Sequence, residues 1–259
     1  MGRQRQETER ENGQTAETEI IYGRNAVLEA LRADKPINKI LMAEESGGSL
    51  RVIAAAAREK RVLLQNADKH LLTQQAGTDK HQGVMAYLAA GAYCTPEDIL
   101  QIAQARGEAP FVILLDEIQD PHNLGAIIRT ADAVGAHGIM IPKRRSAPLT
   151  GVVAKASAGA AAHVPVARVP NLSQAIETLK AHGLWIAGTD MDGDSVFYQA
   201  DLRGPLGLVI GGEGKGIGTL VRRHCDFILS IPMGGRISSL NASVAAGIVL
   251  YEIYRQRLS

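Results

Sequence analysis

The chain has 259 residues, which is long enough for two ordinary domains. Its formal net charge is only +1, so any affinity for nucleic acid requires local clusters of basic residues. No apolar run reaches the roughly 18 residues that a membrane span needs. The two cysteines match no metal or redox spacing, which indicates a reducing compartment such as the cytoplasm. These features argue against a membrane protein, a disulfide scaffold and a generally basic nucleic-acid-binding protein.

The N-terminal third predicts a tail followed by a small domain. Residues 1–18 lack the apolar core of a secretory signal and are predicted to be disordered. Helix and strand patterns then alternate, with helices expected at 23–31, 50–60 and 67–74 and strands at 37–42, 61–65 and 84–88. We therefore expect an α/β domain over residues 19–92. Its polar loop 77–83 carries Lys80 and His81, which either contact a polyanion or belong to a solvated loop.

Residues 93–108 are expected to link this domain to a larger one over residues 109–259. Within the linker, Thr95 followed by Pro96 is typical of a helix start. In the larger domain we expect strands at 111–115, 137–141, 164–169 and 184–188, and helices at 124–134, 152–162 and 172–182. Residues 206–248 add two more strands, each ending in a glycine-bearing loop that leads into a helix. This alternation predicts a largely parallel sheet whose ligands bind beyond the carboxyl ends of its strands.

One stretch of the larger domain is locally basic. Residues 142–170 contain no acidic residue, and they hold Lys143, Arg144, Arg145, Lys155 and Arg168. A phosphate backbone would be attracted to such a cluster, with strong salt dependence. Exposed basic clusters also occur as plain solvated surface, and the sequence leaves both interpretations open.

The glycine loop at residues 211–216 does not fit the common phosphate-binding motifs. A Walker loop requires Ser or Thr where this chain has Gly216, and a dinucleotide fingerprint requires a third glycine where it has Ile217. The acidic run 190–194 imitates a calcium loop, but Ser195 stands where the sharp turn needs glycine. Three histidines lack metal-ligand spacing: His122, His163 and His182. No metal site is predicted.

Three loops remain rich in polar side chains. The first carries Asn123, with Arg129 on the helix that follows; the second carries Glu213; the third carries Ser239 and Asn241. Taken alone, Asn123 fits a helix N-cap and Arg129 a surface charge. The side chains of the third loop stand where the last helix begins, so they either cap it or reach a substrate.

Together these loops resemble the SpoU/TrmH family of RNA ribose 2′-O-methyltransferases, part of the SPOUT superfamily. The three ordered motifs of that family are matched by DPHNLGAIIRTADAVGAHGI, LVIGGEGKGI and IPMGGRISSLNASVAAGI. The segments IYGRNAVLEAL and HQGVMAYL resemble the ribosomal-protein-like substrate-binding domain of the 23S rRNA guanosine methyltransferase branch. The resemblance covers nearly the whole chain after the tail. It implies an α/β fold with a C-terminal deep trefoil knot, a homodimer, and S-adenosylmethionine as cofactor.

The resemblance also implies roles for particular residues. Contact with the cofactor falls on Gly188, Thr189, Gly211, Ile231, Met233 and Leu240. The polar active-site positions fall on Asn123, Arg129, Glu213, Ser239 and Asn241. The family's accounts propose the arginine as a base, but arginine keeps its proton in proteins, so we prefer Arg129 as a clamp on a substrate phosphate. Glu213 is expected to brace the glycine loop or Arg129.

The sequence thus predicts a cytoplasmic enzyme that methylates a ribose 2′-hydroxyl, that of a guanosine in 23S rRNA, with no DNA or membrane partner. One alternative is a tRNA ribose 2′-O-methyltransferase. Another is a catalytically inactive RNA-binding factor in ribosome assembly, which the intact set of polar residues disfavours. A nucleotide hydrolase or dehydrogenase is disfavoured by the failed glycine spacings.

Overall fold

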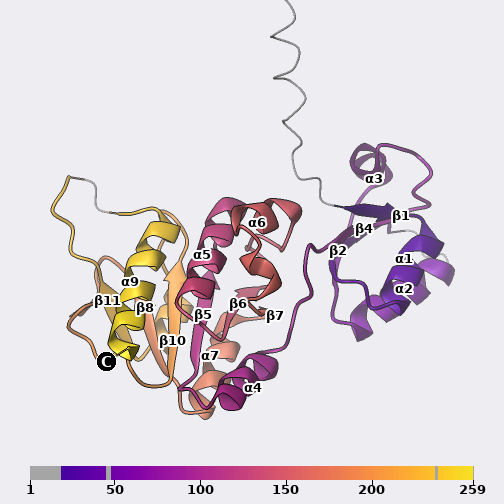
Figure 1. Ribbon diagram of the computed structural model, residues 1–259. Helices are drawn as coiled ribbons and strands as arrows, with labels where there is room; N and C mark the ends of the chain where they lie inside the picture. Colours follow the sequence, from indigo (N-terminus) through magenta and orange to yellow (C-terminus); the bar gives the residue numbers. More distant parts are fainter. Residues whose placement is uncertain (1–18, 45–47, 237–238, 259) are drawn as a thin grey trace, which may run out of the picture. The chain divides into compact units, whose positions relative to one another are not determined.

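The computed structural model describes residues 19–44, 48–236 and 239–258 (Figure 1). The predicted tail, residues 1–18, lies outside these ranges. The chain divides into two compact units. One takes in the chain up to Ala90 together with Leu149–Lys155, and the other takes in Gly91–Pro148 and the chain from Ala156 onward.

The first unit is built on a four-stranded sheet in the order β1-β4-β2-β3. Its strands are β1 (Ile20–Tyr22), β2 (Ile37–Met42), β3 (Leu63–Asn66) and β4 (Val84–Leu88). Strand β4 runs antiparallel to β1 and β2, whereas β2 and β3 are parallel. The helices are α1 (Arg24–Arg32), α2 (Gly48–Glu59) and α3 (Lys69–Ala76). Helices α1 and α2 pack on the sheet face that holds Ile40, and α3 packs on the face that holds Leu41, as expected for alternating side chains.

His81 lies in the loop between α3 and β4 and is buried, with 4% of its surface exposed. Its Nδ1 accepts a hydrogen bond from the Gly83 N–H (3.0 Å), and its Nε2 lies 3.1 Å from the Thr73 hydroxyl. The ring therefore fixes this loop from inside. Burial removes His81 from the residues that can contact a polyanion.

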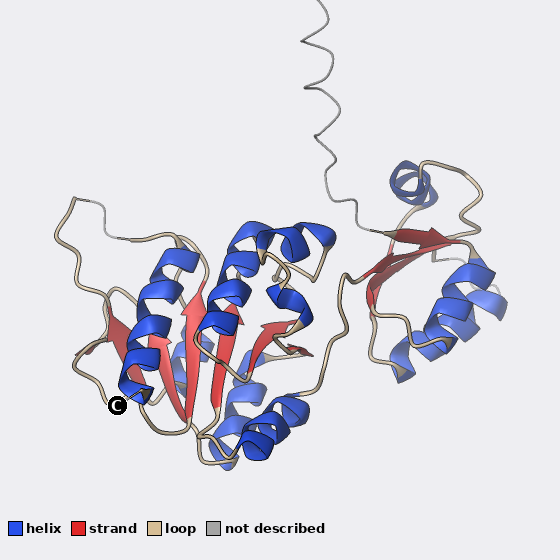
Figure 2. Cartoon of the chain, in the orientation of Figure 1, coloured by secondary structure: helices blue, strands red, loops and turns tan. Residues whose placement is uncertain are grey.

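The second unit holds a seven-stranded sheet in the order β7-β6-β5-β10-β8-β11-β9 (Figure 2). Its strands are β5 (Phe111–Asp116), β6 (Gly138–Pro142), β7 (Val166–Val169), β8 (Trp185–Thr189), β9 (Ser195–Val196), β10 (Leu206–Gly211) and β11 (Phe227–Ser230). Every neighbouring pair is parallel, which confirms the predicted parallel sheet. The loops after β5, β8, β10 and β11 consequently lie at one edge.

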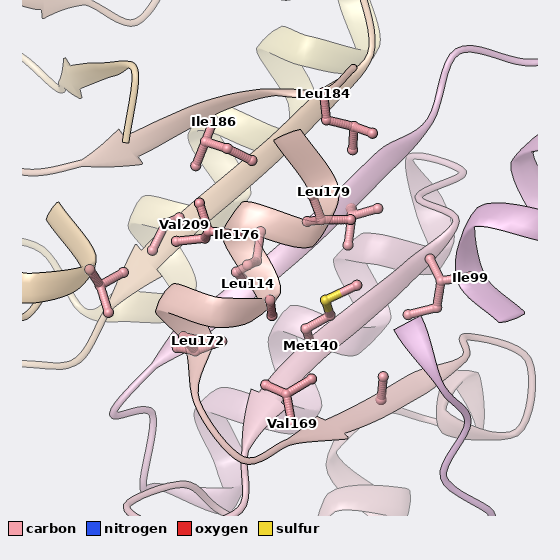
Figure 3. Packing of buried hydrophobic residues seen from close by; sticks show 14 of the residues in the cluster. Ile99, Leu114, Met140, Val169, Leu172, Ile176, Leu179, Leu184, Ile186 and Val209 are labelled. Atoms are coloured by element: carbon pink, nitrogen blue, oxygen red, sulfur yellow. The ribbon is translucent and has the colours of Figure 1, made fainter. Parts of the chain in front are cut away.

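Helices cover both faces of this sheet. They are α4 (Pro96–Arg106), α5 (Pro121–Ala133), α7 (Leu172–Ala181), α8 (Thr219–His224) and α9 (Ala242–Arg257). On one face, Ile99 of α4 and Ile176 of α7 pack against Leu114 and Met140 of the sheet (Figure 3). On the other face, α5 and α9 lie side by side (Figure 1).

Residues 93–108, expected to link the domains, contain helix α4, which packs on the core of the second unit. The Thr95 side chain accepts a hydrogen bond from the Asp98 N–H (3.2 Å), and the Asp98 carboxylate accepts one from the Thr95 N–H (2.8 Å). This capping box begins α4 where the sequence predicted a helix start. Ile99, one turn later, is fully buried.

The single helix predicted over residues 152–162 is wrong. Helix α6 (Gly151–Ala156) ends early, and a short 3₁₀ turn follows at Ala160–Ala162. Between them Ala158 and Gly159 have positive φ values of 51° and 91°. Two successive left-handed residues break the helical hydrogen-bond ladder. A run of alanines gives no apolar stripe from which that break can be predicted.

Candidate active site

A cavity of about 480 Å³ opens at the carboxyl edge of the parallel sheet. Its walls come from the loop after β8, the glycine loop after β10, the loop after β11, and the first turn of α9. These are the places where the sequence predicted ligand binding. The volume falls in the range of small-molecule sites.

All of the residues implied to contact the cofactor line this cavity except Gly188. The lining ones are Thr189, Gly211, Ile231, Met233 and Leu240. Gly188 instead faces the hydrophobic core, where an added Cβ would lie 2.8 Å from Ile228 Cδ1 and 3.0 Å from Cys225 Sγ. Its lack of a side chain is therefore required for packing beneath the site.

The glycine loop, residues 211–216, folds back on itself through close backbone contacts. The Gly216 N–H donates to the Gly212 carbonyl (3.1 Å). A Cβ on Gly211 would lie 2.2 Å from the Gly216 carbonyl carbon, and one on Gly212 would lie 2.6 Å from the Glu117 carbonyl oxygen. Gly214 and Gly216 adopt φ values of 81° and 62°. The backbone of the loop therefore itself requires these glycines.

Three of the predicted catalytic side chains form a hydrogen-bonded cluster, which we call the amide–carboxylate triangle: Asn123, Glu213 and Asn241. Asn241 Nδ2 lies 2.6 Å from Glu213 Oε1 and 2.9 Å from Asn123 Oδ1, and Asn123 Nδ2 lies 3.0 Å from Glu213 Oε1. The members come from the start of α5, the loop after β10, and the start of α9. The fold thus joins three loops that lie far apart in the sequence.

The capping alternatives are now distinguishable. Asn241 is the N-cap of α9, since its Oδ1 accepts hydrogen bonds from the N–H groups of Ser243 (3.0 Å) and Val244 (3.3 Å). Asn123 is no cap: Asp120 caps α5 by accepting from the His122 N–H (2.8 Å), and Asn123 is buried in the first turn.

Two predicted catalytic residues lie outside the triangle. Ser239 is exposed and lines the cavity. Arg129 is exposed on α5, does not line the cavity, and makes no hydrogen bond or ion pair among the residues that the structure describes. Glu213 therefore braces the two asparagines and not Arg129.

Asp190 lines the candidate site but was not predicted, because the run 190–194 was compared only with a calcium loop. It directly follows β8, lines the cavity, and forms an ion pair with Arg222 of α8 at 2.7 Å. Its position just after a strand at the carboxyl edge was the available signal. Among the described residues that line the cavity, Asp190, Asp192 and Glu213 carry carboxylates and Lys215 carries a positive charge, and Arg222 balances the charge of Asp190.

Beneath the cavity, Asp116 ends β5 and ties it to α8. Its carboxylate accepts a hydrogen bond from the Gly218 N–H (2.8 Å) at the start of that helix. Burial raises the pKa of the Asp116 carboxyl, and the hydrogen bond from Gly218 opposes that rise.

Comparison with known proteins agrees with this geometry. Residues 110–251 match the profile of the SpoU rRNA methylase family, and residues 20–94 match that of the RNA 2′-O ribose methyltransferase substrate-binding domain. The chain belongs to the SpoU rRNA methylase family. This family uses S-adenosylmethionine as its cofactor. None of the helices in the described parts of this SpoU-family chain is long and apolar enough to cross a bilayer.

Relatives of the SpoU-family chain cover nearly its whole length. A putative TrmH family tRNA/rRNA methyltransferase, YacO of Bacillus subtilis, is 48% identical over 92% of this chain and 96% of the relative. The crystal structure of AviRb from Streptomyces viridochromogenes with AdoMet is 30% identical, with a TM-score of 0.58 over 92% of this chain and 90% of that one. The AdoMet-bound rRNA methyltransferase of Sinorhizobium meliloti is 28% identical, with a TM-score of 0.59 over 93% and 88%.

Proposed function

We propose that this protein methylates the 2′-hydroxyl of a ribose in RNA, and that its target is a guanosine of 23S rRNA. The observation that carries the proposal is the amide–carboxylate triangle at the rim of the cavity. Further support comes from the substrate-binding profile over residues 20–94 and from the likeness to an rRNA methyltransferase across both units. The deep trefoil knot and a cytoplasmic location are part of the proposal, through the same family likeness.

The cavity suits S-adenosylmethionine in size and in chemistry. Backbone at Gly211 and apolar side chains at Ile231 and Leu240 offer a surface for a flat adenine ring. The carboxylates of Asp190 and Asp192 suit the cofactor's hydroxyl groups and positive charge. When bound, the cofactor supplies a methyl group that its sulfonium has already activated.

The chain's own task is to orient the ribose and to assist departure of its proton. Glu213 Oε1 already accepts from two amides, so it positions Asn123 and Asn241. Ser239 lines the cavity, and in this proposal it presents its hydroxyl to the ribose. We assign Arg129 to the phosphate next to the target ribose, where a planar guanidinium binds two phosphate oxygens and stabilises the developing alkoxide.

We also propose that the protein is a homodimer that uses α9. Three large apolar side chains, two on this helix and one at its C-cap, are exposed at seven-residue spacing: Val244 (51%), Tyr251 (54%) and Leu258 (69%). Residues seven apart lie on one face of a helix, so the three form a stripe. An exposed apolar stripe of this kind is typical of a protein–protein contact.

The test is incorporation of label from S-adenosylmethionine into unmodified 23S rRNA and tRNA transcripts, followed by nucleoside analysis of the product. We expect label in rRNA as 2′-O-methylguanosine. Label only in tRNA would show that the substrate is tRNA and not 23S rRNA. Label on a base would show that the enzyme does not methylate the ribose. Cofactor binding without transfer to either RNA would support the inactive assembly factor.

A further inference from the structure

Residues 143–145, Lys-Arg-Arg, form a basic loop directly after β6. Strand β6 is parallel to its neighbour β5, so this loop lies at the same edge of the sheet as the cavity. Arg144 and Arg145 are exposed, the side chain of Arg145 to 76%. Lys155, the fourth basic residue of the stretch, belongs to the other unit. Residues 143–145 are therefore the part of the basic stretch that lies at the edge of the sheet with the cavity.

The basic loop is held in a defined conformation. The Lys143 N–H donates to the Val169 carbonyl (2.9 Å), and its own carbonyl accepts from the guanidinium of Arg168 (3.2 Å). Arg168 in turn stacks over the ring of Tyr93, with 5.0 Å to the ring centroid. Arg145 adopts a left-handed φ of 58°, which costs energy for a residue with a side chain. The loop therefore presents its basic side chains from a backbone that these contacts hold in place.

The basic loop also adjoins the amide–carboxylate triangle. Arg145 Nη1 lies 2.9 Å from Glu117 Oε1, and the Ala147 N–H donates to the Ile118 carbonyl (2.8 Å). The Glu117 carbonyl packs against Gly212, where an added Cβ would lie only 2.6 Å away. Gly212 immediately precedes Glu213 of the triangle. Continuous contacts thus lead from the basic loop to the site.

We propose that residues 143–145 dock the phosphates of the RNA strand that flanks the target ribose. This proposal rests on the proposed function and names the surface by which the substrate is held. Arg144 has no counter-ion among the described residues, so its guanidinium is available to a phosphate. Arg145 is held ready by Glu117 and exchanges that carboxylate for a phosphate, which its planar fork also fits.

The experiment measures equilibrium binding of a 23S rRNA transcript by the full-length protein over a range of KCl concentrations. The variants are Arg144→Ala and Arg145→Ala, and the control is Arg203→Ala. Arg203 is exposed, pairs with Asp201 as Arg145 pairs with Glu117, and precedes β10 at the opposite edge of the sheet. We expect each loop variant to bind about three- to tenfold more weakly and to lower the slope of log K against log salt by about 1. The control is expected to match the wild type.

Cofactor titration and thermal unfolding of the same variants separate a local effect from a folding defect, and both are expected to be unchanged. Wild-type affinity and salt slope in both loop variants would overturn the docking surface. An equal loss of RNA affinity in the Arg203→Ala control would show that the effect comes from overall charge, which would also overturn the docking surface. The wild type could methylate neither RNA in the transfer assay while Arg144→Ala and Arg145→Ala still bind RNA more weakly than the wild type and the control. In that case the proposed function fails and the docking surface stands. If the wild type binds no RNA, both fail.

Discussion

Asn241 uses the two ends of its amide for different tasks. The oxygen accepts hydrogen bonds from the first N–H groups of α9, and the nitrogen donates to Asn123 and Glu213. From the sequence, capping and participation in the site were alternatives. They are compatible because an amide has a separate acceptor and donor.

Substitution of Asn241 should separate these tasks. Asn241→Ser keeps a good N-cap but removes both donations, so turnover should fall about a hundredfold while stability changes little. Asn241→Ala should lose the same activity and also about 1 kcal/mol of the free energy of unfolding. Single-turnover methylation and urea unfolding give the two quantities. Near-wild-type turnover in the serine variant would remove the triangle from the proposed mechanism.

Arg129 makes no hydrogen bond or ion pair with the three described residues of the triangle, so its proposed role depends on the substrate. If it clamps a phosphate through its planar fork, Arg129→Lys should retain the charge but lose most of the activity, about a hundredfold in kcat/KM for RNA. The matched control is Arg223→Lys on α8, also exposed, which should retain normal kinetics. A lysine variant with near-normal turnover would contradict both the clamp and the base.

The buried side chain of His137 should make the free energy of unfolding depend on pH. Its Nδ1 accepts from the Phe111 N–H (3.0 Å), so a proton there would break a buried hydrogen bond. Burial lowers its pKa below 6.5, assisted by the charges of Arg106 and Arg257 and opposed by Glu108. The unfolded chain therefore binds the proton more readily, and stability is lost as pH falls from 6.5 through the lowered pKa.

Lowering the pKa of His137 by one pH unit corresponds to a loss of about 1.4 kcal/mol in the free energy of unfolding at low pH. Guanidinium unfolding across this pH window should show that loss in the wild type and a smaller one in His137→Gln. Identical slopes for the two proteins would mean that His137 titrates alike in the folded and unfolded states.

At the scale of elements, prediction from sequence succeeded where a single chemical pattern decides the structure. The apolar runs that became β2, β4 and β5 were identified, as was the capped start of α4. The short strands β1 and β9 were missed, because a strand of two or three residues has no period to recognise. Their conformation follows from pairing with β4 and β11, which only the folded sheet provides.

The glycine loop illustrates the same limit for the site. The sequence showed that Gly211 lies at a binding loop, but its contact with Gly216 follows from the way the chain returns on itself. Gly211→Ala should abolish cofactor binding, since a Cβ only 2.2 Å from backbone forces the loop open. Gly234→Ala is the matched control, because its added Cβ meets nothing within 4 Å. Calorimetric titration with S-adenosylmethionine should give wild-type affinity for the control alone.

At the scale of the whole molecule, the parallel order of the sheet creates the site. Loops that are separated in the sequence reach one edge because β5, β8, β10 and β11 run in the same direction. Alternating helix and strand patterns predicted that edge, whereas the neighbours Asp190 and Arg222 were not predicted. Their ion pair depends on where α8 packs, and local sequence does not encode that position.

The apolar stripe formed by Val244, Tyr251 and Leu258 is exposed on the single chain. If two copies bury it against each other, Tyr251→Arg places a charge in the interface and should convert the dimer to a monomer at micromolar concentration. Leu220→Arg on α8 changes an equally exposed apolar residue, 57% against 54%, and should leave the dimer intact. Light scattering of the purified proteins measures the mass directly. A monomeric wild type, or a Tyr251→Arg variant that remains dimeric, would show that the stripe is not the interface. Methyl transfer by a folded monomeric variant would show that one copy suffices for the chemistry.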